Sequence, residues 1–584
     1  MTTAGEHAHT AAPDSSASAA PARVADVIGS TLAALGVRTA FGLTATGNFH
    51  LVNALSAGGV AFVAARHPAG AATMADSYAR ASGRLTVLSV PGGAGVLHAL
   101  PGIAEAASGR SPLLILSDVA NSDPPPARHQ PAVLSAAGVW IERITDPAQT
   151  IEVVLRAAHI ARTRHRPVLL EVPPHLALSP HPAPVPERAD TLDALAALEP
   201  PAPPTADATA VASLTDLLTH ARRPVFLAGR GALQAGPELQ RLAARTGALL
   251  VTSTAAHGLF AGDPFLLGLA GGLATPAMAE LIASADVLIG WGSALGAWTL
   301  HHGLSVGADT VLAQIDVDPA ALGAHCTIDL GVAGDAAATA GTLLQALPKA
   351  KMGYRTAQVR QRIHDHSNWH DVPYQPIEQE GRIDPRTLSL MLDAMLPQER
   401  ILTVGCGNYM GYPIGYLAAP DARGRLSLLC PHTPGSGLAA GIGAALAGTD
   451  RLAVAALGDG SALMAASELE TAVRLRLPLL IVVYNDAAHG APLHHFGAAG
   501  DRLDTVTFPP ADIAAIAAGY GCRAATVRKP ADLNVVTDWL SGPLQHPLLI
   551  DAKVASFPSW WLPASQDGPA APSRGVASSP EELR

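Results

Sequence analysis

The sequence contains few cysteines and no long apolar run. Its 584 residues include four cysteines, Cys326, Cys406, Cys430 and Cys522, and no two of them form a CxxC pair. This scatter gives no zinc site and is typical of a reducing compartment. No apolar run approaches the roughly 18 residues that a membrane span needs, and the polar N-terminus has no apolar signal core. We therefore expect a soluble, cytoplasmic protein.

Positive charge and aromatic residues are scarce as well. Lys and Arg number 38 against 48 Asp and Glu, which gives a net charge of −10, and the basic residues form no cluster. This argues against nucleic acid as a partner. Aromatic residues make up 4% of the chain, whereas hydrophobic residues make up 49%, much of it alanine. Such a composition favours globular domains with helices packed tightly on sheets.

The chain is too long for one hydrophobic core, because single cores stop growing at roughly 250–300 residues. Within it, short apolar runs alternate with helical patterns, and near-continuous apolar runs are typical of parallel strands buried on both faces. We predict an α/β fold of three doubly wound parallel-sheet domains at 22–185, 205–350 and 381–562, with disordered tails at 1–21 and 563–584. The expected strands are 86–90, 113–116, 168–172, 225–228, 287–290, 311–315, 452–456, 479–484 and 548–550.

Two polar motifs stand at the carboxyl ends of expected strands, where open α/β sheets bind ligands. Gly458-Asp459-Gly460-Ser461 follows one strand, Asn485-Asp486 follows the next, and a helix over 461–476 joins them. The glycines let the backbone approach a ligand, and the start of the helix favours an anion. The two aspartates suit Mg²⁺ that bridges to phosphate oxygens. A lone GDG is also found in tight turns, but the strand–helix–strand context and the second aspartate favour a ligand site.

The segment from Gly458 to Gly490 resembles the thiamine-diphosphate (ThDP) signature of acetolactate synthase, benzoylformate decarboxylase and pyruvate decarboxylase. It has the GDG start, a helix with Glu-Leu, a Leu-Pro step into a strand and an Asn-Asp end. The resemblance implies that Mg²⁺ binds Asp459, Asp486 and the main-chain oxygen of Ala488. It also implies an enzyme that makes or breaks bonds next to the carbonyl of 2-oxo acids.

Further blocks extend this resemblance over nearly the whole chain: residues 66–83 and 89–106 in the first domain, 222–232 and 314–323 in the second, and 403–409 and 434–447 in the third. They imply a pyrimidine-binding first domain, a central domain and a diphosphate-binding third domain. The cofactor then lies between the first domain of one subunit and the third domain of its partner, in a homodimer or homotetramer. The cofactor contacts that the resemblance implies are Gly407, Asn408, Tyr409, His432, Pro434, Gly458, Asp459, Gly460, Ser461, Asp486 and His489.

The sequence departs from the family at two positions. Pro68 stands where most members have the Glu that hydrogen-bonds the cofactor's pyrimidine N1′, and glyoxylate carboligase lacks that Glu too. Pro434 replaces the aliphatic residue that bends the cofactor, and the main-chain oxygen of His432 is expected to meet its exocyclic amine. Because a histidine moves protons near neutral pH, His67, His98 and His489 are candidate catalytic residues. Packing or hydrogen bonding is the alternative for each of them.

Other features have simpler interpretations. Asp316-Val317-Asp318-Pro319 favours a helix cap over a metal site, and Ser461 favours a phosphate contact over a nucleophile. Trp560-Trp561 suits either a lid or plain packing.

Three functions remain open at this point. The first is a ThDP- and Mg²⁺-dependent carboligase or decarboxylase, and the second is a ThDP-binding pseudoenzyme that acts as a binding or assembly partner. A nucleotide-linked oxidoreductase is a minor third, because no G-x-G-x-x-G follows a strand in 205–345.

Overall fold

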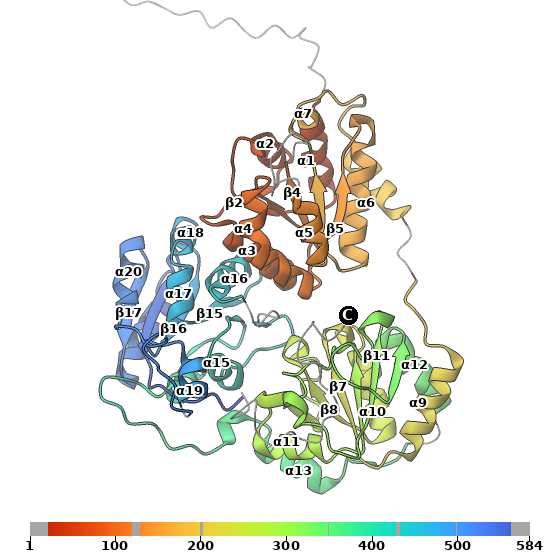
Figure 1. Cartoon of the computed structure of the whole chain (residues 1–584), viewed down its shortest axis with the longest axis vertical. Helices are drawn as coiled ribbons and strands as arrows, with labels where there is room; N and C mark the ends of the chain where they lie inside the picture. Colours follow the sequence, from red (N-terminus) through yellow and green to blue (C-terminus); the bar gives the residue numbers. More distant parts are fainter. Residues whose placement is uncertain are drawn as a thin grey trace, which may run out of the picture.

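The computed structural model describes residues 22–118, 129–198, 202–347, 350–427, 433–497 and 499–561. Both expected tails lie outside these ranges. The described chain forms three sheets, each of six parallel strands with helices between them, so the predicted fold class is confirmed (Figure 1). No helix in the described ranges is long and apolar enough to cross a membrane.

The first sheet has the strand order β2-β1-β3-β4-β6-β5. Its four central strands are buried throughout, whereas the edge strands β2 and β5 are partly exposed. Its strands are β1 Thr39–Gly42, β2 Ala61–Ala64, β3 Thr86–Ser89, β4 Leu113–Ser117, β5 Trp140–Arg143 and β6 Val168–Glu171. Its helices are α1 Val24–Ala34, α2 Phe49–Ala57, α3 Pro68–Ser82, α4 Ala94–Ser108, α5 Gln130–Ala136, α6 Thr150–Thr163, α7 Pro174–Ala177 and α8 Arg188–Ala196.

The central sheet has the order β12-β11-β10-β7-β8-β9. At the end of β11, Asp318 caps a short 3-10 helix, η7 (Pro319–Ala321), by accepting the N–H of Ala320 at 3.0 Å, as the sequence predicts. The strands are β7 Pro224–Ala228, β8 Leu249–Thr252, β9 Leu266–Leu269, β10 Val287–Trp291, β11 Val311–Asp316 and β12 Leu330–Ala333. The helices are α9 Ala208–His220, α10 Gly236–Thr246, α11 Pro276–Ala283, α12 Ala336–Ala346 and α13 Ala357–His366.

The third sheet has the order β14-β13-β15-β16-β18-β17. Its strands are β13 Arg400–Val404, β14 Arg425–Ser427, β15 Leu452–Gly458, β16 Leu479–Asn485, β17 Arg523–Val527 and β18 Leu548–Lys553. Its helices are α14 Pro385–Met395, α15 Gly411–Tyr416, α16 Ser436–Ala445, α17 Asp459–Met464, α18 Glu468–Arg474, α19 Gly490–Gly497, α20 Ile513–Tyr520 and α21 Asn534–Leu540.

Where the sequence predicts a single helix over 461–476, the structure has two, α17 and α18. The first starts two residues earlier, at Asp459, and the chain leaves regular helix over 465–467. The break precedes Glu468, whose carboxylate accepts hydrogen bonds from the first domain. A tertiary contact of this kind leaves no trace in the helical spacing of apolar residues, which is why the periodicity alone predicts one continuous helix.

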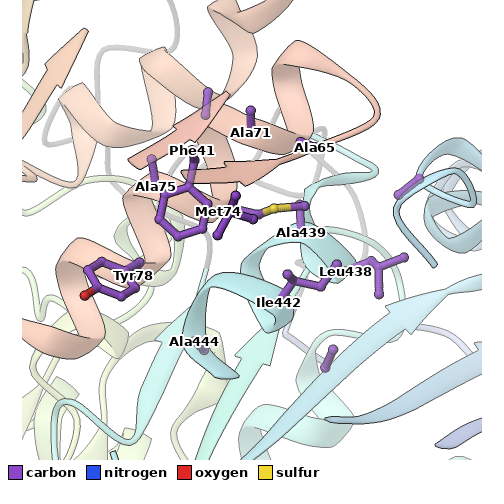
Figure 2. Packing of buried hydrophobic residues seen from close by; sticks show 14 of the residues in the cluster. Phe41, Ala65, Ala71, Met74, Ala75, Tyr78, Leu438, Ala439, Ile442 and Ala444 are labelled. Carbon is purple, nitrogen blue, oxygen red and sulfur yellow. The ribbon is translucent and has the colours of Figure 1, made fainter. Parts of the chain in front are cut away.

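Helices α3 and α16 join the first and third domains in one hydrophobic core. Met74 on α3 lies against Leu438, Ala439 and Ile442 on α16, and all four side chains are buried (Figure 2). The helices are very close, because a Cβ added at Gly443 would lie 2.2 Å from the backbone oxygen of Met74. The abundant small residues of the sequence permit this packing, which fixes the two domains relative to each other.

Candidate active site

A cavity of about 560 Å³ opens at the carboxyl edge of the third sheet. The loop after β13, the start of α17, the turn after β16 and residues 554–557 after β18 form its walls. The structure thus brings together every described residue of the predicted cofactor and metal sets: Gly407, Asn408, Tyr409, Pro434, Gly458, Asp459, Gly460, Ser461, Asp486, Ala488 and His489. His432 lies outside the described residues.

Two neighbouring carboxylates dominate the cavity's electrostatics. β15 and β16 are neighbours with Gly458 opposite Tyr484, so Asp459 and Asp486 follow adjacent strand ends. Burial raises the pKa of both carboxyls, and for Asp486 burial together with the charge of Asp459 raises the pKa to about 7. Among the described residues, neither aspartate forms an ion pair. A divalent cation would relieve this like-charge repulsion, so the donor set fits Mg²⁺.

The turn after β16 places Asp486, and not Asn485, in the wall of the cavity. Asn485 is buried, and its amide donates to Asp551 at 2.8 Å. Ala487 then adopts a left-handed φ of 60°. Gly490 packs closely against Asp486, since a Cβ at this position would lie 2.8 Å from a carboxylate oxygen of Asp486. The described part of the chain has no group of three His, Cys, Asp or Glu side chains that could hold a metal, so a cation here needs main-chain oxygens or water as well.

The side chains of Asn408 and Tyr409 have partners inside the chain. Asn408 donates to the backbone oxygen of Phe557 at 3.0 Å and accepts a hydrogen bond from Ser559. The Tyr409 hydroxyl donates to the backbone oxygen of Ala456 at 3.2 Å. Their polar side-chain groups are therefore engaged elsewhere, and any cofactor contact from these two residues would come from the ring or the backbone.

Residues 554–561, here called the C-terminal strap, form one wall of the cavity. Phe557 lines it, and Trp561 packs on Gly411, where a Cβ would lie 2.0 Å from the indole. Trp560 and Trp561 both meet the Tyr412 ring edge to face, at 5.1 and 5.5 Å between centroids. The two tryptophans thus pack on Tyr412 and Gly411, as the packing interpretation expects, and the lid stays a prediction.

The predicted catalytic histidines fall into two places. His489 lines the cavity, with its ring 4.9 Å from that of Phe508. His67 and His98 are exposed at the first domain and are not among the residues that line the cavity. They stack on each other with 5.7 Å between ring centroids and 11° between planes. Beside them Pro68 begins α3, and the His67 ring accepts the N–H of Ala69 at 3.2 Å.

Glu468 is a buried carboxylate that sequence reasoning missed. It accepts the backbone N–H groups of Arg66 and His67 at 3.1 and 2.9 Å, and the Thr471 hydroxyl at 2.7 Å. Gly70 makes room for it, because a Cβ there would lie 2.3 Å from the carboxylate. Burial raises the pKa of Glu468. Its Glu-Leu context belongs to the recognised signature, but no sequence signal names its partner 401 residues away.

Three family models match the chain. They are the N-terminal TPP binding domain of thiamine pyrophosphate enzymes at residues 22–130, the central domain at 211–347 and the C-terminal TPP binding domain at 427–552. Thiamine pyrophosphate is another name for ThDP. The matches cover each of the three sheets in part or in full.

Alignments with several named proteins extend over most of the chain. A probable 2-ketoarginine decarboxylase of Pseudomonas aeruginosa is 31% identical over 86% of this chain and 88% of its own. A sulfoacetaldehyde acetyltransferase of Castellaniella defragrans is 27% identical over 79% and 80% of the two chains. The structure of a ThDP-dependent 4-hydroxybenzoylformate decarboxylase of Rhodococcus jostii RHA1 superposes with a TM-score of 0.75 at 19% identity, over 92% of this chain and all of the other. The chain therefore belongs to the thiamine-pyrophosphate enzyme family and carries both of its cofactor-binding domains.

Proposed function

We propose that this protein is a ThDP- and Mg²⁺-dependent enzyme that breaks or forms a carbon–carbon bond next to the carbonyl of a 2-oxo acid. One observation carries the proposal. Two partly buried carboxylates, which form no ion pair among the described residues, lie at adjacent strand ends in a cavity lined by glycine backbone. A bound cation would relieve the repulsion within such a pair, and Mg²⁺ in turn bridges well to phosphate oxygens.

Each residue of the cavity would have its own role in binding the cofactor. Asp459, Asp486 and the main-chain oxygen of Ala488 would hold Mg²⁺, and the backbone at Gly458 and Gly460 would adjoin the diphosphate. Ser461 would contribute its hydroxyl, which accepts the N–H of Gly435 at 3.4 Å. Pro434 would support the bent cofactor through its rigid apolar ring. Bound ThDP supplies a thiazolium ring that takes up the electron pair released when a 2-oxo acid loses CO₂.

Proton transfer would be the task of the histidines. His489 lies on the cavity wall of the third domain, and the His67–His98 pair lies exposed on the first domain. In the shared arrangement of the family, the first domain of a second copy would bring its pair over this cavity. The active species is then at least a homodimer. Sedimentation tests this: a strict monomer that turns over substrate would contradict the shared site.

The named relatives indicate the substrate class. They include a decarboxylase of a 2-oxo acid, a sulfoacetaldehyde acetyltransferase and a probable acetolactate synthase large subunit of Methanococcus aeolicus, 25% identical. All three names concern small carbonyl compounds. We infer a small 2-oxo acid donor, with either a proton or a second carbonyl compound as the acceptor.

A panel of 2-oxo acids tests the proposal. The full-length protein is incubated with ThDP, Mg²⁺ and each acid, alone and with an aldehyde acceptor, and CO₂ and coupled products are measured by mass spectrometry. We expect CO₂ release with at least one donor. No product with any donor, together with tight ThDP binding, would favour the second candidate, a pseudoenzyme.

Pro68 is the observation that supports this second candidate, because a proline at the start of α3 cannot hydrogen-bond the pyrimidine. Hydrogen–deuterium exchange at C2 of bound ThDP separates the two. Exchange no faster than in free ThDP would identify a pseudoenzyme, and faster exchange would identify an enzyme.

A further inference from the structure

The turn that carries the proposed metal ligands contains a strained residue. Ala487 lies between Asp486 and Ala488, which both line the cavity, and it has a left-handed φ of 60°. Alanine disfavours this conformation because its Cβ crowds the following carbonyl oxygen, whereas glycine adopts it readily. The turn therefore needs contacts from elsewhere in the chain to keep its shape.

Residues 503–508 supply such contacts through their backbone. The N–H of Phe508 donates to the carbonyl oxygen of Ala487 at 2.9 Å, so the strained residue is held directly. The N–H of His489 donates to the carbonyl oxygen of Val506 at 2.8 Å. The turn is thus tied to this segment both at the strained residue and two residues later.

These two hydrogen bonds also determine where the main chain of Ala488 points. Ala488 lies opposite Thr507 in an isolated antiparallel bridge, between the two bonds. In such a pair the N–H and C=O groups of the bridged residue point away from the neighbouring segment. The N–H of Ala488 accordingly donates to the carboxylate of Asp486 at 3.3 Å. The carbonyl oxygen that the proposed function assigns to Mg²⁺ is therefore directed away from residues 503–508.

The side chain of Phe508 adds a contact to the same turn. Its ring meets the His489 ring edge to face, with 4.9 Å between centroids and 78° between planes. The His489 ring also lies near Gly460, where a Cβ would be 3.6 Å from the ring atom Cε1. Phe508 is 46% exposed, so burial in a hydrophobic core does not explain its position.

We propose that Phe508 is a positioning residue of the metal site. With the backbone of residues 503–508, its ring holds the turn that carries Asp486 and Ala488 in the conformation that binds Mg²⁺. This inference rests on the proposed function and adds a residue that is not among those that line the cavity. The competing explanation is that the exposed ring packs against a second copy of the chain.

The test compares Phe508→Ala with Phe496→Ala in the full-length protein. Phe496 is a matched control on α19: it is 50% exposed, and its ring meets the His495 ring edge to face at 4.7 Å, outside the cavity lining. Calorimetric titration of Mg²⁺ in the presence of ThDP gives the Kd for the metal. We expect Phe508→Ala to raise this Kd about 2- to 12-fold, the range for a lost aromatic pair, and Phe496→Ala to leave it unchanged.

Two further readouts separate positioning from a general structural role. Phe508→Ala should bind ThDP more weakly than the wild type at limiting Mg²⁺ but with wild-type affinity at saturating Mg²⁺, because excess metal stabilises the turn by mass action. Adding Ala487→Gly to Phe508→Ala should restore the affinity for Mg²⁺, because glycine adopts the left-handed conformation without help from the ring.

An unchanged Kd for Mg²⁺ in Phe508→Ala would overturn the assignment. A loss of ThDP affinity that saturating Mg²⁺ does not restore, or a defect that Ala487→Gly does not reduce, would overturn it too. Weaker self-association of Phe508→Ala in sedimentation, with an unchanged Kd, would identify the second copy as the partner of the ring and also overturn the assignment. The proposed function fails in a different way. If the wild-type protein binds no ThDP with Mg²⁺, both are wrong, whereas normal metal binding by Phe508→Ala removes only the role of Phe508.

Discussion

The first and third sheets have the same strand order, but they differ at the side where the carboxyl ends of their strands lie. These two sides are here called the first edge and the third edge. In the third domain the strand ends converge on a cavity with two partly buried acids, and the C-terminal strap covers one side. In the first domain the corresponding edge carries a stacked and exposed histidine pair, His67 and His98. One edge encloses a cavity, and the other is an exposed surface that carries two histidines.

This difference indicates how the two edges would cooperate. The third edge supplies the charges that a metal and a diphosphate require, but only one of the three candidate histidines. The first edge supplies the other two histidines, and none of its described residues lines the cavity of the same chain. We therefore propose that a site that uses both edges takes its histidine pair from the first domain of another copy. If the two edges have these separate roles, substitutions at each edge should have different effects.

The largest effect is expected from removing an acid of the third edge. Asp486→Ala should weaken ThDP binding at saturating Mg²⁺ by at least roughly 100-fold, because even residues that only orient a metal ligand cost 10–100-fold when mutated. The ligand-free protein should become more stable, since the repulsion from Asp459 disappears. Calorimetric titration and thermal unfolding check the two effects. Asp318→Ala, an exposed capping aspartate of the central domain, is the control. Unchanged ThDP affinity in Asp486→Ala would remove the basis of the metal site.

The next effect should come from the first edge and should appear in kcat alone. His98→Ala should lower kcat by about 100-fold, the lower end of the range for general acid–base catalysis, because His67 remains beside it. The Kd for ThDP should stay within about 2-fold, since this edge holds no metal or diphosphate group. Steady-state kinetics on the best donor and calorimetry measure the two quantities. His220→Ala, an exposed histidine on α9, is the control. A normal kcat for both His98→Ala and His67→Ala would exclude the first edge from proton transfer.

The two edges also differ in how far the sequence predicts them. At the third edge, Asp459 and Asp486 lie at the ends of strongly apolar strands, so local pattern and strand order together bring them close. All nine expected strands occur, and each of them is a near-continuous apolar run. Other strands escape prediction: β5 and β17 are edge strands with partly exposed residues, whereas β1, β8 and β13 are fully buried and were missed as well.

What the sequence could not predict depends on partners distant in the chain. Asn408 was expected at the diphosphate, but its amide is held by the strap some 150 residues later. Glu468 accepts hydrogen bonds from Arg66 and His67 across a domain boundary, and the helix break lies directly before it. In each case the residue type was visible, while its partner was set by tertiary structure.

A moderate effect is expected where the third edge is closed by its own strap. Asn408→Ala removes both hydrogen bonds to the strap, so ThDP should dissociate about 5- to 30-fold faster, as two ordinary hydrogen bonds suggest. Stopped-flow displacement of ThDP measures the rate. Asn534→Ala, an exposed asparagine at the start of α21, is the control. If Asn408→Ala dissociates at the wild-type rate, the strap does not retain the cofactor, and closure of the third edge depends on the second copy alone.

The smallest effect concerns the contact that joins the two edges within one chain, and it depends on pH. Burial raises the pKa of Glu468 above its ordinary value of 4.5, so the folded protein binds this proton more tightly than the unfolded chain does. The stabilisation from this group is fully present below the unfolded pKa and is lost as the pH rises through the folded pKa. Glu468→Gln does not titrate there. The wild type should therefore lose stability relative to Glu468→Gln as the pH rises from about 4 to 7, by at most about 1.4 kcal/mol per pH unit. Urea unfolding across this range measures the difference in the free energy of unfolding. If that free energy depends on pH in the same way for both proteins, the contact of Glu468 with the first domain does not make stability depend on pH.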